Sequence, residues 1–412
     1  MSGGSEKIER IAEEVAEVGI GRVGLAPCRY YLSTGCTILD LAISGRYPGG
    51  VGGGRVSHFY GDASTAKSVI VQQILGAAQR AGGYAILEDA EQTFDFDRAK
   101  LFGLDVDGWT GLEDEDKKLE EAIKRSSKFC YRLPLSIEQL YDEEIGQAIE
   151  LIEKGKLPHN TVIGIDSVSA LPSKEEQEGG VEGAGYGTSR AKVFSRAFRK
   201  YIGRMASCGL TVILIDQIRE KIGVMFGKKH AVSGGKAKDF YASTQVLLTN
   251  RGKIKNKYGQ VIGVEIGFEV EKNKIYVPFL SGQFRLLFDI GIDDVGTNLV
   301  WLRENAEYLP DFVEEKEAIQ QEYLEKINAL RAEGKTGIRQ LQREMEEKIR
   351  ELKASSVGGK EWRFKDLTAK SLDELAVKVE EANREKEVEE EVVKAWQHIH
   401  QPVKRKARYL ID

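Results

Sequence analysis

Apolar residues recur along this chain with two different periods. In residues 5–17 they fall at helical spacing, which predicts a short amphipathic helix. From about residue 28 to 305, apolar runs such as RVSHFYG, GYAILEDA, TVIGIDSVSAL and LTVILIDQ alternate with helical stretches. This alternation is typical of an α/β protein with a mostly parallel, twisted sheet. The later runs STQVLLTN, GVEIGFEVEKN and QFRLLFDIG are joined by short turns and predict an antiparallel extension of that sheet.

The pattern changes to helices after about residue 306. Apolar positions lie on one helical face within residues 319–330 and again within 338–352, with EGKTG between them. These stretches predict a helical hairpin. We therefore divide the chain into an N-terminal helix and linker for protomer–protomer contact (1–27), an α/β core (28–305) and a C-terminal hairpin with an accessory region (306–412).

Composition and charge exclude several classes of protein. No apolar run approaches the ~18 residues that a membrane span needs, so we expect no membrane association. The net charge of −5 argues against a broad surface that coats nucleic acid, although local basic loops stay compatible with DNA binding. Cys28, Cys36, Cys130 and Cys208 form no C-x-x-C pair, and we expect them to be reduced core residues of a cytoplasmic protein.

The stretch GDASTAKS comes close to the phosphate-binding pattern G-x-x-x-x-G-K-[ST]. It lies between the strand-like RVSHFY and the helical SVIVQQILGAAQRAG, the setting that such loops require. Backbone N–H groups at the helix start point toward bound phosphates, and the helix dipole favours their charge. Lys67 is expected to reach the β- and γ-phosphates and Ser68 to bind Mg²⁺. The candidate nucleotide-binding residues are Gly61, Asp62, Ala63, Ser64, Thr65, Ala66, Lys67 and Ser68.

Ala66 replaces the second glycine of that pattern. Gly61 stands where the chain turns sharply, and a Cβ is expected to clash there. Position 66 lies near the helix start, where we expect a negative φ that alanine adopts with little strain. Asp62 adds a negative charge that is expected to weaken phosphate binding slightly. A degenerate loop that no longer binds nucleotide is the alternative.

Three polar residues at strand ends complete the candidate site. Asp166 ends the run VIGID, where its carboxylate can hold Mg²⁺ through water. Glu91, in LEDAEQ, can orient or deprotonate the attacking water, with Glu88 and Asp89 as competitors for that role. Gln217 ends LTVILIDQ and can sense the γ-phosphate by hydrogen bonding, or it is an ordinary strand-end amide.

Several segments together resemble the RecA-type homologous recombinases. In order over residues 28–302 they are YLSTGCTILDLAI, the phosphate loop, LEDAEQ, VIGIDSVSAL, IDQIREKIGVMFG, SGGKAKDFYAS and VEKNKIYVPF. The altered second glycine is similar to phage-encoded members. The resemblance implies a RecA-like ATPase core that uses ATP and Mg²⁺, with Glu91 activating water and Gln217 linking the γ-phosphate to a DNA-binding loop. It also implies that Lys272 and Lys274 reach the ATP bound by the adjacent subunit.

Two positions depart from the family's pattern. Arg98 stands where the family usually has a tyrosine that stacks on adenine. A guanidinium plane can also stack, so an altered nucleotide preference is expected. Asp95, Arg98 and Asp166 are assigned to nucleotide binding together with the phosphate loop. In KDFYAS, Asp239 occupies a position that is commonly lysine at the subunit interface, which leaves the interface contacts open.

Two glycine-rich loops are candidates for DNA binding. The first, residues 173–192, opens a helix whose cations Arg190, Lys192 and Arg196 can meet phosphates. The second, residues 219–236, combines cations with Met225 and Phe226, and apolar wedges beside cations can hold a single strand. Composition alone favours an ordinary surface loop, whereas the resemblance favours DNA. The expected contacts of the second loop are Arg219, Lys221, Gly223, Val224, Met225, Phe226, Gly227, Lys228, Lys229, Gly234, Gly235 and Lys236.

The resemblance implies an ATP-dependent recombinase that forms helical filaments on single-stranded DNA and catalyses homologous pairing and strand exchange with duplex DNA. One alternative is a regulatory or assembly ATPase of the same superfamily without strand exchange. Another is a structural filament protein with little turnover. The expected setting is the cytoplasm, that of a bacterial host for a phage-encoded chain. A single-strand-binding or loader protein is an expected further partner.

Overall fold

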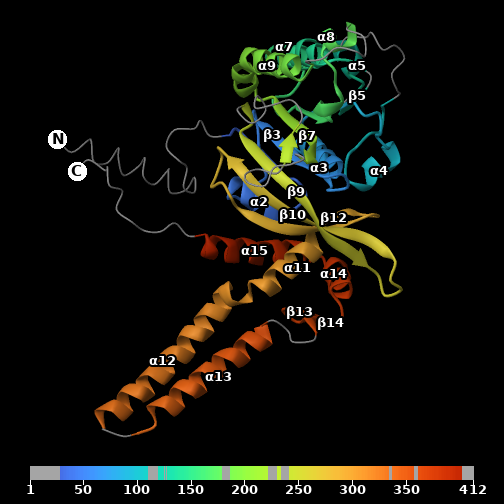
Figure 1. The fold of residues 1–412 in the computed structure, drawn as a ribbon. Helices are drawn as coiled ribbons and strands as arrows, with labels where there is room; N and C mark the ends of the chain where they lie inside the picture. The colour runs from blue at the N-terminus through green and yellow to red at the C-terminus, as the bar shows by residue number, and fades with distance from the viewer. Residues whose placement is uncertain are drawn as a thin grey trace, which may run out of the picture. The chain divides into compact units, whose positions relative to one another are not determined.

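A mostly parallel sheet dominates the first of the two units into which the chain divides, Met1–Asp293 and Asp294–Asp412 (Figure 1). The computed structural model describes residues 28–109, 119–124, 126, 128–178, 186–220, 230–232, 241–333, 336–356 and 361–400. The expected helix at residues 5–17 lies outside these ranges. The division falls before residue 305 because the helix after Asp293 makes its contacts with the C-terminal helices.

Ten described strands form the sheet. Their bounds are β3 Val56–Gly61, β4 Ala85–Asp89, β5 Phe129–Arg132, β6 Val162–Asp166, β7 Thr211–Glu220, β8 His230–Val232, β9 Thr244–Lys255, β10 Val261–Asn273, β11 Ser281–Leu287 and β12 Gly291–Asp293. The order is β12-β11-β10-β9-β3-β7-β6-β4-β5, with β8 paired to β7. The strands from β9 to β5 in that order are parallel, while β10, β11, β12 and β8 pair antiparallel. The predicted α/β sheet with an antiparallel extension is therefore confirmed.

Helices cover both faces of this sheet. On one face, α3 (Lys67–Arg80) packs so closely on β6 that a Cβ on Gly164 would lie 2.4 Å from Val71 Cγ1. On the other face, rings from α9 (Tyr186–Cys208) and the π-helical turn η1 (Leu140–Ile145) build a core, in which Tyr141 meets Phe194 and Phe198 edge to face. Burial of these apolar surfaces is the main force that holds the layers together. The other helices are α2 Thr37–Ser44, α4 Phe96–Leu101, α5 Leu119–Ile123, α6 Ile137–Gln139, α7 Gly146–Glu153 and α8 Lys174–Glu178.

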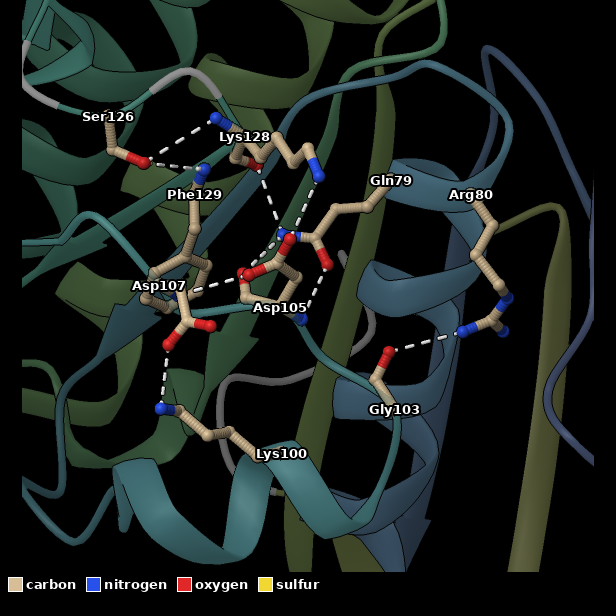
Figure 2. Close-up of polar contacts among 9 residues, drawn as sticks. All are labelled: Gln79, Arg80, Lys100, Gly103, Asp105, Asp107, Ser126, Lys128 and Phe129. Carbon is tan, nitrogen blue, oxygen red and sulfur yellow. Dashed lines mark hydrogen bonds and ion pairs between the residues drawn. The ribbon is translucent and has the colours of Figure 1, made fainter.

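Polar contacts tie the loop after α4 to the end of α3 (Figure 2). Gln79 Nε2 donates to the Asp105 carbonyl (2.7 Å), and Gln79 Oε1 accepts from the Asp105 N–H (2.8 Å). Arg80 Nη1 donates to the Gly103 carbonyl (3.1 Å), and Lys128 Nζ lies 2.9 Å from Asp105 Oδ2. Since α3 begins at the phosphate loop, these bonds hold α4 in a set position beside that loop.

The hydrophobic pattern does not predict strand β5. Its four residues, FCYR, end in Arg132, whose side chain is buried and pairs with Glu144 at 2.8 Å. A charged residue interrupts the apolar run by which an inner strand is predicted. Burial of that charge is costly unless a partner from elsewhere in the fold pairs with it.

The second unit consists mainly of helices. Pro310 begins α12, a first-turn position that proline favours because its missing N–H would have no helical partner there. Trp301 and Trp396 lie with ring centroids 6.0 Å apart, and Arg303 lies over the Trp362 ring at 4.3 Å. None of the described helices is long and apolar enough to cross a bilayer. The elements are α11 Asp294–Glu304, α12 Pro310–Ala332, α13 Ile338–Ser356, β13 Trp362–Phe364, β14 Leu367–Ala369, α14 Leu372–Glu381 and α15 Glu385–Ile399.

Candidate nucleotide-binding site

The carboxyl ends of four parallel strands meet at one edge of the sheet. In the strand registers, Gly61 of β3 lies opposite Gln217 of β7, and Asp89 of β4 lies opposite Asp166 of β6. Ligands of open α/β sheets bind at this edge. A cavity of about 390 Å³ opens there, within the range of small-molecule sites. It is lined by Ala63, Ser64, Thr65, Ala66, Lys67, Ser68, Val69, Glu91, Arg98, Asp166, Ser167, Gln217, Val264, Leu286 and Phe288.

Gly61 is required by the close approach of a neighbouring strand. A Cβ at this position would lie 2.1 Å from the Leu248 carbonyl oxygen of β9 and 3.0 Å from Thr65 Oγ1. The first distance is far below van der Waals contact, so the expected clash is present. The first glycine of the motif therefore keeps β3 and β9 paired up to the start of the loop.

The expectation of a negative φ at Ala66 is wrong. Ala66 has φ 65° and ψ 11°, in the left-handed region, and caps the N-terminus of α3. Ser64 in the same loop has φ 59°. Two left-handed residues, Ser64 and Ala66, thus turn the chain between β3 and α3. Alanine bears a strain of about 1 kcal/mol here that glycine would avoid.

The Lys67 ammonium is directed back onto its own loop. Nζ donates to the carbonyls of Gly61 (3.1 Å) and Asp62 (2.5 Å) and to Thr65 Oγ1 (3.3 Å). Burial lowers the pKa of Lys67, and the carboxylates of Asp166 and Asp62 oppose that shift. A cation in this position is available to an anion that enters the loop, because a phosphate oxygen can replace the carbonyl partners.

Ser68 and Asp166 form a pair of oxygen ligands suited to Mg²⁺. Ser68 Oγ donates to Asp166 Oδ2 at 2.6 Å, which brings a hydroxyl and a carboxylate together beside Lys67. Hard oxygen ligands of this kind are those Mg²⁺ uses. Burial raises the pKa of Asp166 to about 6, with a further rise from Glu91 and Asp89. The site therefore carries a carboxylate that a cation would stabilise in its charged form.

The structure separates Glu91 from its two competitors. Asp89 is buried and accepts from four backbone N–H groups, those of residues 91–94, and from the Tyr131 hydroxyl, so its oxygens hold the turn together. Glu88 is 0% exposed, and burial holds its pKa well above the usual range. Glu91 lines the cavity, where Oε1 accepts from Ser167 Oγ at 2.5 Å. The geometry favours Glu91 as the carboxylate for an attacking water.

Arg98 forms one wall of the cavity. Asp95 begins its helix, because the Asp95 carboxylate accepts from the N–H groups of Asp97 and Arg98. The guanidinium lies 5.6 Å from the centre of the Phe102 ring. Arg98 also lines a neighbouring cavity of about 160 Å³ with Asp95 and Phe102. Asp95 and Arg98 thus lie beside the phosphate loop, as a role in base binding requires.

The sequence pattern did not predict the apolar residues that line the cavity together with Arg98. Val264 of β10 is paired with Leu286 of β11, and Phe288 lies two residues further on. Alternate strand residues face the same side, so Leu286 and Phe288 both line the cavity. The strands themselves are predictable, but their position beside the phosphate loop depends on β9 crossing to β3. Phe288 offers a flat apolar surface that suits a nucleobase.

The lysine pair and the DNA-loop candidates have different local settings. Strand β10 ends at Asn273, so Lys274 lies one residue beyond it, and the Lys274 N–H donates to the Ser243 carbonyl.

Arg190 donates to the backbone carbonyls of residues 168, 169 and 171, so a phosphate contact would require release of these bonds. Lys192 and Arg196 are exposed on α9. Residues 221–229 and 233–240, including Met225, Phe226 and Asp239, lie outside the described residues.

Restoring glycine at position 66 should stabilise the protein. We expect Ala66→Gly to raise the free energy of unfolding by about 0.5–1 kcal/mol in denaturant titrations, because glycine adopts the left-handed region without strain. Nucleotide turnover should change less than about tenfold. Ala63→Gly is the control: Ala63 has no positive φ, so glycine there should lower stability. A loss of stability in Ala66→Gly would contradict the strain argument.

The buried Asp166 should make stability depend on pH. Its pKa, raised by burial to about 6 from 3.8 in the unfolded chain, means that the folded state binds the proton more tightly. Asp166→Asn should therefore add on the order of 2 kcal/mol above pH 6, and the gain should vanish as pH falls toward 4. Asp105→Asn should do the opposite: the bond from Lys128 lowers the pKa of Asp105, which stabilises the protein at neutral pH. Urea titrations from pH 4 to 8 measure the free energy of unfolding of both variants. A gain in Asp166→Asn that does not change with pH would contradict the raised pKa of Asp166.

Comparison with known proteins places this arrangement in a family. The family described as RecA N-terminal domain matches residues 8–111 and 120–293. "Protein RecA" of Amycolatopsis mediterranei is 33% identical over 293 residues, which cover 70% of this chain and 75% of that protein. "Protein RecA" of Clostridium acetobutylicum is 33% identical over 275 residues, covering 66% and 70%. Since the family match spans the phosphate loop and every other residue of the cavity, the chain belongs to the RecA family.

Proposed function

We propose that this protein is an ATP-dependent DNA recombinase. It would form helical filaments on single-stranded DNA and catalyse homologous pairing and strand exchange with duplex DNA. The observation that carries the proposal is the convergence of Lys67, the Ser68–Asp166 pair and Glu91 on one cavity. Membership of the RecA family and the name shared by two relatives support the DNA substrate.

The residues of the cavity have distinct tasks in this proposal. Lys67 leaves its loop carbonyls and binds the β- and γ-phosphates of ATP. Ser68 and Asp166 would hold Mg²⁺, Asp166 through water, and the bound ion would supply positive charge beside the phosphates. Glu91, held by Ser167, orients a water molecule and accepts its proton. Arg98 and Asp95 meet the nucleobase.

Coupling to DNA would run through β7. The Gln217 amide lines the cavity, and β7 continues to Glu220, inside the second loop. Strand β8 also belongs to that loop and pairs with β7, Arg219 opposite Ala231. The nucleotide state therefore reaches the loop through two bonded strands. In a filament, Lys272 and Lys274 would cap the ATP of the adjacent protomer, so ATP and DNA would each tighten binding of the other.

A regulatory or assembly ATPase with the same core, but without strand exchange, is the second candidate. It fits the cavity equally well, since both candidates use the same lining residues for ATP. The basic, aromatic second loop favours the recombinase. A nucleotide-binding filament protein with little turnover fits less well, because the Glu91 carboxylate lines the cavity, where Ser167 Oγ donates to it.

Removal of the Lys67 ammonium should abolish ATP turnover. We expect Lys67→Ala to lower DNA-stimulated hydrolysis by at least about 100-fold, as loss of a charge-stabilising donor does elsewhere. Electron microscopy with single-stranded DNA and a non-hydrolysable ATP analogue should show helical filaments for the native protein and none for this variant.

Lys100→Ala is the matched control, because the Lys100 ammonium pairs with Asp107 outside the cavity. It should change turnover less than about twofold. If Lys67→Ala keeps full DNA-stimulated hydrolysis, the assignment of the ATP site to this loop is wrong. If the native protein stays monomeric with single-stranded DNA and the ATP analogue, the recombinase proposal is wrong.

The second loop should bind DNA through its apolar side chains. Replacing Met225 and Phe226 by alanine should weaken binding of a labelled single-stranded oligonucleotide by at least about tenfold, since stacking contributes ~1–3 kcal/mol per base. Nucleotide affinity should stay within about twofold, because neither residue lies at the phosphate loop. Leu135→Ala, which truncates an exposed apolar residue elsewhere, is the control. Equal DNA affinity in the double variant and the control would exclude this loop.

A further inference from the structure

A buried polar pair joins the strand of the phosphate loop to the strand of Gln217. His58 Nε2 on β3 lies 2.8 Å from Asp216 Oδ2 on β7, and both side chains are 0% exposed. Successive strand residues face opposite sides, so Asp216 points away from the cavity that Gln217 lines. Neither His58 nor Asp216 has a role in the proposed binding and hydrolysis of ATP.

The same sheet face carries a second polar contact. Tyr60, two residues after His58, donates from its hydroxyl to Glu271 Oε2 on β10 at 2.7 Å. The His58 and Tyr60 rings stack with centroids 5.0 Å apart and an interplanar angle of 28°. Asp216, His58, Tyr60 and Glu271 therefore touch in sequence across the sheet.

The chemistry of the pair defines where its proton lies. A carboxylate only accepts, so His58 Nε2 carries the hydrogen of the bond. Nδ1 of His58 has no hydrogen-bond partner among the described residues. Burial of such groups is costly, and two apolar side chains would pack there without the desolvation penalty.

A β-bulge brings Glu271 to Tyr60. In the β9–β10 ladder, Val270 lies opposite Val246 and Lys272 opposite Gln245, so Glu271 is an extra residue between them. Bulges of this kind redirect side chains near functional sites. The distortion lies directly before Lys272, and the acid that it re-aims reaches across β9 to the strand of the phosphate loop.

We propose that Asp216, His58, Tyr60 and Glu271 form a positioning relay that connects the γ-phosphate sensor to the lysine pair. Gln217 follows Asp216 and Lys272 follows Glu271, so a shift of one strand end is transmitted to the other through bonded groups. The relay makes the nucleotide bound in one protomer's loop and the contact to the next protomer's nucleotide interdependent. The inference rests on the proposed function, where Gln217 and Lys272 act on ATP.

Loss of the Tyr60 hydroxyl should uncouple nucleotide from DNA. The readout is the ratio of oligonucleotide dissociation constants without and with a non-hydrolysable ATP analogue, measured by fluorescence anisotropy on the full chain. Tyr60→Phe keeps the ring and removes the bond to Glu271, and we expect it to reduce this ratio by at least about fivefold. DNA-free ATP turnover should change less than about twofold, because the loop, Lys67 and Glu91 stay in place.

Tyr84→Phe is the matched control. Tyr84 is likewise buried, and its hydroxyl donates to the carbonyls of Ser126 and Phe129, far from the relay in the sheet order. It should leave the ratio unchanged. A merely structural role for Tyr60 would lower stability and leave the ratio at the native value, and that outcome would overturn the relay.

A double-variant cycle tests continuity of the relay. His58→Phe and Glu271→Leu should each reduce the ratio, and their combination should reduce it little further, because members of one relay lose the same coupling once. If the reduction in the double variant equals the product of the two single reductions, the residues act independently and the relay is rejected. If His58→Phe does not fold, Asp216→Asn replaces it. If the native protein shows no tightening by the analogue, the proposed function fails; native tightening with unchanged variants rejects the relay alone.

Discussion

Parallel pairing of β3 with β7 and of β4 with β6 is the constraint on which the rest of this molecule depends. Strands that run in one direction end at one edge, so Gly61, Gln217, Asp166 and the turn after Asp89 meet there although they are far apart in the chain. The spacing between strands is set by backbone hydrogen bonds. Strand pairing therefore sets the approximate position of each functional group, and the loops set its final orientation.

The edge so formed is electrostatically unbalanced. Asp166, Glu91 and Asp62 surround Lys67, and burial raises the pKa of Asp166 to about 6 while it lowers that of Lys67. Groups whose charged forms are disfavoured by burial lie where a triphosphate and its cation would restore balance. The left-handed Ala66 adds backbone strain at the same point. The folded protein is thus less stable at the site where a ligand would bind, and such local strain is common at functional sites.

The two faces of the central strands divide the work. Gln217 of β7 faces the cavity, whereas Asp216 faces the side covered by α9, where it is paired with His58. Because adjacent residues share a backbone, polar contacts on the covered face can influence groups on the open face. Strand β10 adds a third element through the bulge at Glu271. In the proposed relay, these contacts would couple the protomer's own nucleotide site to the lysine pair that would contact the next protomer's nucleotide.

Periodicity and local motifs determined the strand order along the chain, the α/β class and the phosphate loop, because these depend on neighbours within about ten residues. They could not choose among Glu88, Asp89 and Glu91. That choice follows from β4 pairing, which buries Glu88, and from a turn that occupies both oxygens of Asp89. Nor could they place Phe288 in the same cavity as Arg98, predict β5 around a buried Arg132, or predict φ 65° at Ala66. Each of these is decided by atoms distant in sequence, or by a loop closing against them, and no local pattern encodes such contacts.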